Sequence, residues 1–225
     1  TALLHHITEE RLRNAYLKLN KQAAAGIDEV TWEQYRKNLE ENVQGLHRRL
    51  HQGAYRAKPS RRAFIAKTDG QKRARGLAAL EDKIVQGAVV EVLSAIYEGD
   101  FLGFSYGFRP GRGQHDALDA LATGIGRKKV SFVLDADIRG FFDTMDHVWL
   151  IKFIEHRIAD KRVVRLIRKW LNAGVMEDQR WTECKEGVPQ GATISPLLAN
   201  LYLHYVLDLW AQRWRKRDAR GEMIL

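Results

Sequence analysis

The stretch VLDADIRGFFDTMDH, residues 133–147, sets two carboxylates in an apolar run and adds two more acids after a glycine. Burying a carboxylate is costly unless a cation or hydrogen-bond donors replace the lost water. Asp137 stands where a predicted strand becomes a loop, and a carboxylate there suits a hard cation such as Mg²⁺, which commonly takes one or two carboxylates plus substrate phosphates. Asp146 precedes an apolar helical pattern, so we interpret it as a helix cap. A DxD pair alone also occurs in metal-dependent sugar transferases and phosphatases.

Two glycine-rich segments carry further candidate binding groups. In GVPQGATISPLLAN, residues 187–200, the Pro-Gln-Gly at 189–191 joins a glycine, which lets backbone approach a ligand, to an amide that can bind sugar or base edges. The Ser-Pro at 195–196 is typical of a helix N-cap and first position. In FSYGFRPGRGQHDAL, residues 104–118, aromatics alternate with glycines and arginines, which suits stacked bases and held phosphates. Taken alone, this segment favours packing in a core loop.

The charge of the chain points to an anionic partner. Lysine and arginine outnumber aspartate and glutamate by 37 to 28, for a formal net charge of +9. Such an excess attracts nucleic acid, although a well-solvated basic surface would have the same composition. RRAFIAK, TDGQ and KRARGL together predict a β-hairpin that carries one acid, Asp69. Its basic residues, which predict phosphate binding, are Arg61, Arg62, Lys67, Lys72, Arg73 and Arg75.

The elements that position these groups alternate between helices and strand pairs. Residues 130–138 alternate like a strand, with Asp135 and Asp137 on one face, and 175–188 predict a second hairpin. Helix periodicity is found in 7–56 (two or three helices), 81–98, 115–125, 146–158, 160–173 with Gly174 as its cap, and from 195 onward. This order predicts an α+β fold in which helices pack antiparallel strands.

The single cysteine, Cys184, excludes an internal disulfide and a cysteine-rich metal site, and it fits a reducing, cytoplasmic location. No apolar run approaches the roughly 18–20 residues that cross a bilayer, so we expect no membrane role.

Together and in this order, the segments resemble the reverse transcriptases encoded by group II introns, which combine polymerase and maturase roles. The resemblance runs along nearly the whole chain through AAAGIDEVTWEQYRKNLEENVQGLHRRLHQGAYRAKPSRRAFIAK, DKIVQ, FSYGFRPGR, LDADIRGFFDTMDH and VPQGATISPLLANLYLHYVLD. It implies the fingers and partial palm of a right-hand polymerase. Residues 1–58 would be an N-terminal helical extension, 59–129 the fingers, and 130–225 an incomplete palm with interleaved fingers-associated helices.

The resemblance also implies roles for single residues in nucleotidyl transfer by two cations about 3.5–4 Å apart. Asp137 resembles the first catalytic aspartate, and Ile138 lends a backbone carbonyl to the Mg²⁺ ions. The residues that resemble a nucleotide site are Lys67 and Arg73, which grip the triphosphate, Phe142, which excludes a ribose 2′-hydroxyl, and Gln190, which lines the pocket.

The partners implied are an RNA template (intron RNA), a DNA primer and dNTPs. The alternative function is a non-catalytic RNA-binding maturase module that assists intron splicing. A sugar transferase with a DxD pair would leave the basic hairpin and the Pro-Gln-Gly unexplained. The candidate RNA contacts are Arg61, Arg62, Arg109, Arg112, Arg165, Arg168 and Lys169.

One feature of the resembling family is absent here. Its members carry a Tyr-Ala-Asp-Asp hairpin that supplies the remaining metal-binding carboxylates, and this sequence contains no Asp-Asp dipeptide. We therefore expect an N-terminal portion of a longer enzyme that is inactive alone, because one aspartate does not complete a two-cation site. An exposed palm edge near residues 223–225 would favour self-association.

Overall fold

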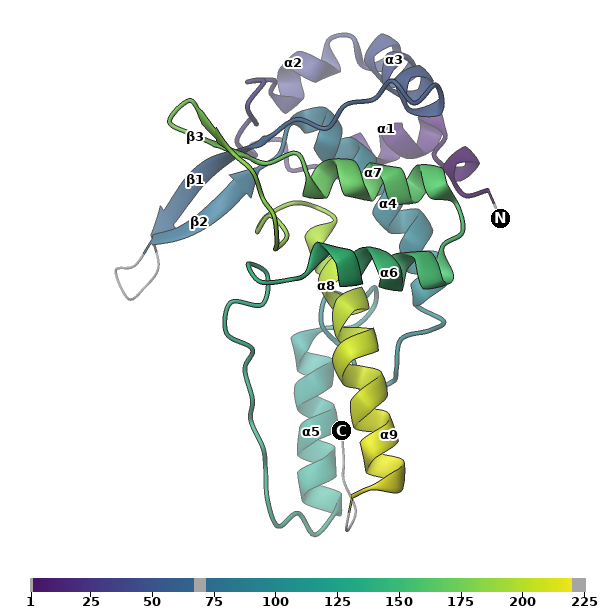
Figure 1. Ribbon diagram of the computed structural model, residues 1–225, viewed down its shortest axis with the longest axis vertical. Helices are drawn as coiled ribbons and strands as arrows, with labels where there is room; N and C mark the ends of the chain where they lie inside the picture. The colour runs from purple at the N-terminus through teal and green to yellow at the C-terminus, as the bar shows by residue number, and fades with distance from the viewer. Residues whose placement is uncertain (1, 67–71, 220–225) are drawn as a thin grey trace.

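The computed structural model describes residues 2–66 and 72–219, in which one small sheet lies at one side of the helices (Figure 1). The predicted α+β class is confirmed. None of the described helices combines the length and apolar character needed to span a membrane. In chain order the elements are η1 (Leu4–His6), α1 (Glu9–Leu17), α2 (Trp32–Arg36), α3 (Leu39–His51), β1 (Ser60–Ala66), β2 (Lys72–Leu77), α4 (Leu80–Tyr97), α5 (Gln114–Arg127), α6 (His147–Arg157), α7 (Lys161–Leu171), β3 (Val175–Glu177), β4 (Arg180–Thr182), α8 (Ser195–Leu203), the π-helix η2 (His204–Asp208) and α9 (Leu209–Arg217).

The predicted N-terminal helices are present, and threonine caps define where two of them begin. The Thr8 hydroxyl accepts a backbone N–H hydrogen bond at the start of α1. Thr31 forms a capping box with Gln34 at the start of α2. Tyr16 of α1 stacks on Trp32 of α2 with ring centroids 4.8 Å apart, and both rings are buried. The connection between α1 and α2 is therefore held by an aromatic pair.

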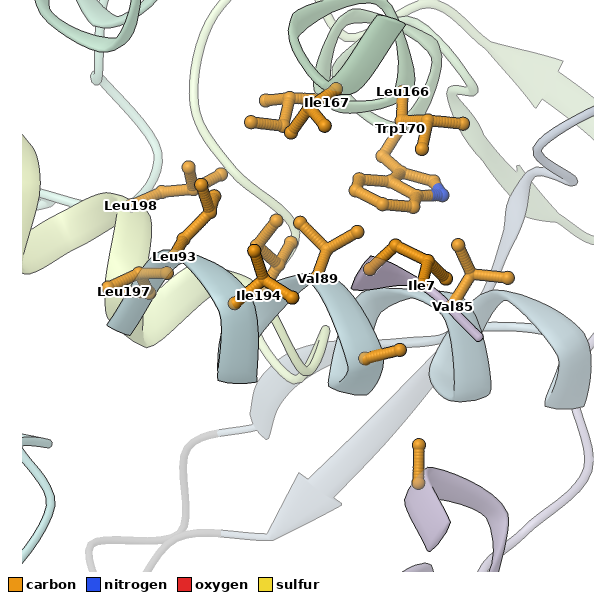
Figure 2. Close-up of a cluster of buried hydrophobic side chains, with 14 of the residues drawn as sticks. Ile7, Val85, Val89, Leu93, Leu166, Ile167, Trp170, Ile194, Leu197 and Leu198 are labelled. Carbon is orange, nitrogen blue, oxygen red and sulfur yellow. The ribbon is translucent and has the colours of Figure 1, made fainter. Parts of the chain in front are cut away.

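Helix α4 is the centre of the hydrophobic core. The sequence predicts one apolar face, but buried side chains occur around most of the helix because α1 lies on one side and α7 and α8 lie on others (Figure 2). Burial of each large aliphatic side chain contributes roughly 1.5–3 kcal/mol. The labelled residues that meet around α4 are Ile7, Val85, Val89, Leu93, Leu166, Ile167, Trp170, Ile194, Leu197 and Leu198.

The two predicted hairpins join into a single sheet of strand order β2-β1-β3-β4. Pairs β1–β2 and β3–β4 are antiparallel, whereas β1 runs parallel to β3 with Ser60 opposite Val175. The Ser60 N–H donates to the carbonyl of Gly174 at 3.0 Å. Gly174 has φ +78°, and a Cβ there would lie 2.4 Å from Trp181 Nε1, so this turn requires glycine. The turn after α7 thus brings the second hairpin to the first.

The predicted strand at residues 130–138 is wrong. The segment has no regular secondary structure, and Phe132 and Leu134 are 94% and 88% exposed. An alternating pattern defines two faces, but a strand forms only when a neighbour supplies backbone hydrogen bonds. In the described part of the chain no strand pairs with this segment. Asp135 and Asp137 are consequently exposed rather than buried.

The predicted cap at Ser195 is also wrong. The N-cap position of α8 is Ile194, which makes no side-chain capping bond, and Ser195 is the first helical residue. Its hydroxyl instead donates to the carbonyl of Pro189 at 2.8 Å. The Ser195 hydroxyl therefore bonds to the preceding loop and does not cap the helix.

Candidate functional site

A tight turn at Gly140 shapes one wall of the candidate site. Gly140 has φ +64°, and its carbonyl accepts from the N–H groups of Asp143 (2.9 Å) and Thr144 (3.1 Å) and from the Thr144 hydroxyl (3.1 Å). This turn follows Asp137 closely along the chain. Asp146 then caps α6 by accepting from the Trp149 N–H at 2.9 Å, which confirms its predicted role.

The loop that begins at Gly187 is bonded to this turn. The Gly187 N–H donates to the Met145 carbonyl at 2.8 Å, and the Val188 N–H donates to the Phe142 carbonyl at 2.7 Å. Gly187 has φ +79°, and a Cβ there would lie 2.7 Å from the Asp143 carbonyl oxygen. Glycine is thus required on two counts, backbone conformation and close approach.

The Pro-Gln-Gly segment also contacts the basic hairpin. The Gly76 N–H, at the end of β2, donates to the carbonyl of Gln190 at 2.8 Å. Gly191 follows with φ +105°, and a Cβ there would approach the Gly76 carbonyl to 3.2 Å. The Gln190 side chain donates from Nε2 to both carboxylate oxygens of Asp143, at 3.2 and 3.3 Å. Three segments distant in sequence therefore meet at Gln190.

These segments enclose one open cleft. Four of the residues predicted for metal and nucleotide binding line it together, namely Asp137, Ile138, Phe142 and Gln190. Lys67 lies outside the described residues, and Arg73 is described only by its backbone, paired with Ile65 in the hairpin. The cleft is also lined by Arg75, one of the hairpin residues predicted to bind phosphate, and by Asp143, for which the sequence predicted no role. Asp143 lies in the acidic motif at residues 133–147, and Arg75 lies in the basic hairpin, so the sequence indicates both segments.

The cleft mixes charges of both signs. Arg62 and Arg75 face it from the hairpin, and Glu183, Lys185 and Glu186 face it from the loop after β4. Arg62 also forms an ion pair with Glu177 at 3.4 Å. Cations near bound phosphates and carboxylates near a divalent ion are both required for phosphoryl chemistry.

The residues that could hold a metal ion are the Asp137 carboxylate and the Ile138 carbonyl. In the described part of the chain the Asp137 carboxylate has no hydrogen-bond or ion-pair partner, so it is available to a cation. Oxygen donors of this kind fit a hard cation that retains water and binds phosphate. Residues 2–66 and 72–219 contain no group of three or more His, Cys, Asp or Glu arranged to hold a metal.

A second basic depression lies on α7, away from this cleft. It is lined by Arg56, Arg165, Arg168, Lys169 and Asn172 among others. Arg168 is paired with Glu155 at 3.0 Å, and the Lys169 ammonium donates to the Tyr55 carbonyl. Arg56 and Arg165 have no ion-pair partner among the described residues, so their charges remain available.

The other predicted RNA contacts are partly used inside the fold. Arg109 is only 7% exposed; its guanidinium pairs with Glu98 at 2.9 Å and donates to the carbonyls of Leu102 and Ser105. The structure therefore contradicts an RNA contact by Arg109, which anchors its own loop. Arg112 donates to the carbonyl of Gly103 at 2.6 Å and lies over the Tyr106 ring, which fits the packing interpretation of residues 104–118. Arg61 donates to the carbonyl of Ala25 at 2.8 Å but is exposed.

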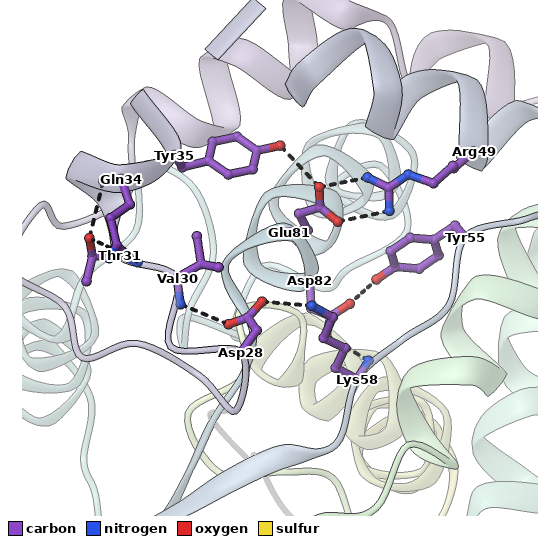
Figure 3. A network of polar contacts seen from close by, with 10 residues as sticks. All are labelled: Asp28, Val30, Thr31, Gln34, Tyr35, Arg49, Tyr55, Lys58, Glu81 and Asp82. Carbon is purple, nitrogen blue, oxygen red and sulfur yellow. Dashed lines mark hydrogen bonds and ion pairs between the residues drawn. The ribbon is translucent and has the colours of Figure 1, made fainter. Parts of the chain in front are cut away.

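A polar network that the sequence did not predict joins the start of α4 to the segments around Asp28, Arg49 and Tyr55 (Figure 3). Asp82 of α4 is 2% exposed and accepts from the Tyr55 hydroxyl and from the Lys58 N–H at 3.0 Å. Burial raises the pKa of Asp82 to about 6, against the two hydrogen bonds that lower it. Trp170 of α7 donates to the Tyr55 hydroxyl at 2.8 Å. Asp82 also lines a small enclosed cavity whose other wall is the Val188–Pro189 backbone loop.

Comparisons with known proteins show which family this sequence matches. Residues 65–224 match the family described as "Reverse transcriptase (RNA-dependent DNA polymerase)". "Protein YkfC" of Escherichia coli (strain K12) is 36% identical over 200 residues, which cover 88% of this chain and 52% of that protein. "Group II intron-encoded protein LtrA" of Lactococcus lactis subsp. cremoris is 40% identical over 175 residues, covering 76% and 29%. The chain thus spans about half, or less, of these relatives.

A likeness in structure supports the same fold. The chain superposes on a chain of a solved structure titled "Partial Cas6-RT-Cas1--Cas2 complex" with a TM-score of 0.56 and 21% identity, over 95% of this chain and 35% of that one. At this identity the comparison concerns the fold alone, which is consistent with the fingers and palm arrangement expected above.

Proposed function

Since the chain belongs to the reverse transcriptase (RNA-dependent DNA polymerase) family, we propose that it forms the nucleotide-binding cleft of a group II intron reverse transcriptase, in which DNA is synthesised on an RNA template. The observation that carries the proposal is the convergence of Asp137, Ile138, Phe142 and Gln190 on one cleft beside the basic hairpin.

The proposed metal site consists of the Asp137 carboxylate and the Ile138 carbonyl. When bound there, Mg²⁺ would favour loss of the primer 3′-hydroxyl proton and neutralise charge on the departing pyrophosphate. The carboxylate of Asp137 contributes the negative charge that retains the cation, and the Gly140 turn holds that part of the chain against the Phe142 wall. A two-cation site needs more carboxylates than Asp137 alone, so we propose that other residues of the complete protein supply them.

The proposed nucleotide site consists of Phe142, Gln190 and the hairpin. Phe142 is half-buried, and its ring meets that of Phe141 edge-on with centroids 5.7 Å apart, which limits its movement toward a sugar 2′-hydroxyl. Asp143 orients the Gln190 amide, because a carboxylate accepts hydrogen bonds only. Lys67 and Arg73 would hold the triphosphate by charge-assisted hydrogen bonds.

Nucleotide binding by this chain tests the proposal directly. We expect a dNTP with Mg²⁺ to bind more tightly than the matching ribonucleotide, and Phe142→Ala to remove that preference. Asp137→Asn should abolish the Mg²⁺ dependence of binding. Phe153→Ala, an aromatic change outside the cleft lining, is the control. Nucleotide binding that is insensitive to both cleft variants would contradict the assignment.

Primer extension separates the family function from the activity of this chain alone. With an RNA template, a DNA primer, dNTPs and Mg²⁺, we expect no extension by these 225 residues. Sustained cDNA synthesis would show that this chain itself contains the carboxylates that the two-cation site needs besides Asp137.

A second candidate function, an RNA-binding maturase module, is favoured by the basic depression on α7. Because Arg168 and Lys169 are already bonded within the fold, Arg56 and Arg165 are the cations of this depression that remain available. If each neutralises one phosphate, Arg56→Gln/Arg165→Gln should lower the slope of log affinity against log salt by about 1.4–1.8. Arg213→Gln/Arg217→Gln on α9 removes equal charge as the control. Equal slopes for both double variants would exclude this depression as the RNA site.

A further inference from the structure

His147 is the last residue of the acidic motif at residues 133–147, and it belongs to neither the proposed metal site nor the proposed nucleotide site. It is half-buried at the first position of α6. Its Nε2 lies 2.6 Å from the carbonyl oxygen of Gly187. Because a carbonyl oxygen only accepts, Nε2 carries the proton and the imidazole donates this hydrogen bond. The ring thus reaches from α6 to the loop that forms the wall of the cleft.

The imidazole of His147 is not needed for the start of its own helix. Asp146 already caps α6 by accepting from the Trp149 N–H at 2.9 Å. His147 is also not among the described residues that line the cleft, so we assign it no contact with a bound nucleotide. Its hydrogen bond therefore serves the loop.

The loop that carries Gln190 has a glycine at each end. Gly187 has φ +79° and Gly191 has φ +105°, and glycine has the greatest conformational freedom of any residue. Between them, Pro189 has no N–H with which to anchor the loop. The position of Gln190 therefore depends on the hydrogen bonds that the other loop groups make.

The carbonyl groups of the loop accept hydrogen bonds from three different elements. The carbonyl of Pro189 accepts from the Ser195 hydroxyl of α8 at 2.8 Å. The carbonyl of Gln190 accepts from an N–H at the end of β2 at 2.8 Å. The carbonyl of Gly187 accepts from His147 of α6. The imidazole is thus the side-chain donor at the beginning of the loop.

We propose that His147 is a positioning residue of the nucleotide site, an inference that rests on the function proposed above. The carbonyl of Gly187 and the N–H of Val188 belong to one planar peptide group. The imidazole holds the carbonyl, and the N–H donates to the carbonyl of Phe142 at 2.7 Å. If this peptide group rotates, the backbone partner of Phe142 and the loop that carries Gln190 move together. Both the affinity for a dNTP and the choice between deoxyribose and ribose therefore depend on His147.

Nucleotide titrations of the 225-residue chain with Mg²⁺ test this role. His147→Leu removes the donor, and we expect dNTP binding to weaken about two- to tenfold, the range expected for one hydrogen bond. The preference for a dNTP over the matching ribonucleotide should fall as well. Partial unfolding would lower both affinities equally and leave their ratio unchanged.

Two further variants make the titration specific. His147→Gln retains an N–H that can donate, so it should keep most of the affinity and of the preference. His115→Leu, the same change at an exposed position of α5, is the control. Equal losses in His147→Leu and His147→Gln, or an unchanged preference in His147→Leu, would overturn the proposal.

Hydrogen exchange distinguishes a failure of this inference from a failure of the proposed function, because it needs no nucleotide. Under conditions in which every variant is folded, the Val188 N–H should exchange faster in His147→Leu than in the wild type, His147→Gln or His115→Leu. Unchanged exchange in His147→Leu would refute the positioning role. Faster exchange in a protein that binds no dNTP would instead refute the proposed function, and with it the role of His147 in nucleotide binding.

Discussion

Gly187 lies against the backbone of Asp143 so closely that a single added carbon would overlap it, at 2.7 Å from the Asp143 carbonyl oxygen. This contact lets the later loop donate two backbone hydrogen bonds to a loop more than forty residues earlier, from Gly187 to the Met145 carbonyl and from Val188 to the Phe142 carbonyl. The wall of the cleft is consequently a backbone structure, on which the side chains of Phe142 and Gln190 are displayed.

Gly187→Ala should destabilise the fold by about 1–3 kcal/mol, because it adds both a positive-φ penalty and a backbone clash. The measurement is the free energy of unfolding in urea. Gly103→Ala is the matched control, since its φ is not positive and nothing lies within 4 Å of a Cβ there. Equal losses for the two variants would refute the close approach at Gly187.

Asp82 should make stability depend on pH between about 4 and 6. Its folded pKa, about 6, is raised by burial above the unfolded value near 3.9, so the native state binds the proton more tightly. The resulting stabilisation is fully present below about pH 4 and is lost as pH rises through 6, on the order of 1–3 kcal/mol.

The comparison that isolates Asp82 is the wild type against Asp82→Asn, by urea unfolding across this pH range. The variant carries no titrating carboxyl group at position 82, so its stability should fall less between pH 4 and 7. Asp208, whose pKa burial also raises to about 6, titrates in both proteins and cancels in the difference. If the stability of the two proteins changed equally with pH, the pKa of Asp82 would not be raised in the folded state.

Asp160→Ala should cost about 1–3 kcal/mol of stability near neutral pH. The buried carboxylate accepts from the N–H groups of Leu3 (2.6 Å) and Leu4 (3.0 Å) and pairs with Arg162. Although burial acts to raise the pKa of Asp160, these bonds together hold it well below its usual range. Its stabilisation is therefore present above the unfolded pKa and is lost only in strong acid.

Thermal or urea unfolding of Asp160→Ala measures that loss. Asp119→Ala, a change of the same type at an exposed position of α5, provides the baseline. If both variants unfold alike, the N-terminal segment does not depend on Asp160.

Asp143→Ala should weaken dNTP binding about two- to tenfold, the range expected for one hydrogen bond. The loss follows because the Gln190 amide would no longer be oriented by the carboxylate. Asp143→Asn should retain most of the affinity, since its carbonyl oxygen still accepts from Nε2. Nucleotide titrations of the two variants distinguish orientation from charge, and a larger loss in Asp143→Asn would contradict the orienting role.

Local pattern predicted well those elements whose stability is largely local. Amphipathic periodicity placed α4, α6 and α7 within a few residues of their observed bounds, and the basic hairpin and the Asp146 cap are where the sequence predicted them. The order of motifs indicated the family, and the cleft contains Asp137, Ile138, Phe142 and Gln190 together. Such features depend on spacing along one chain segment, which the sequence displays directly.

The tertiary structure decided what depends on partners far along the chain. Residues 130–138 alternate like a strand but lack a paired neighbour in the described chain, and Ser195 gives its hydroxyl to Pro189 instead of its helix. Arg109 is used inside its loop, and Asp82 is buried under Tyr55. A residue's type and spacing determine which bonds it can make, but which of them form depends on the groups that folding brings within reach, because hydrogen bonds act only over about 3 Å.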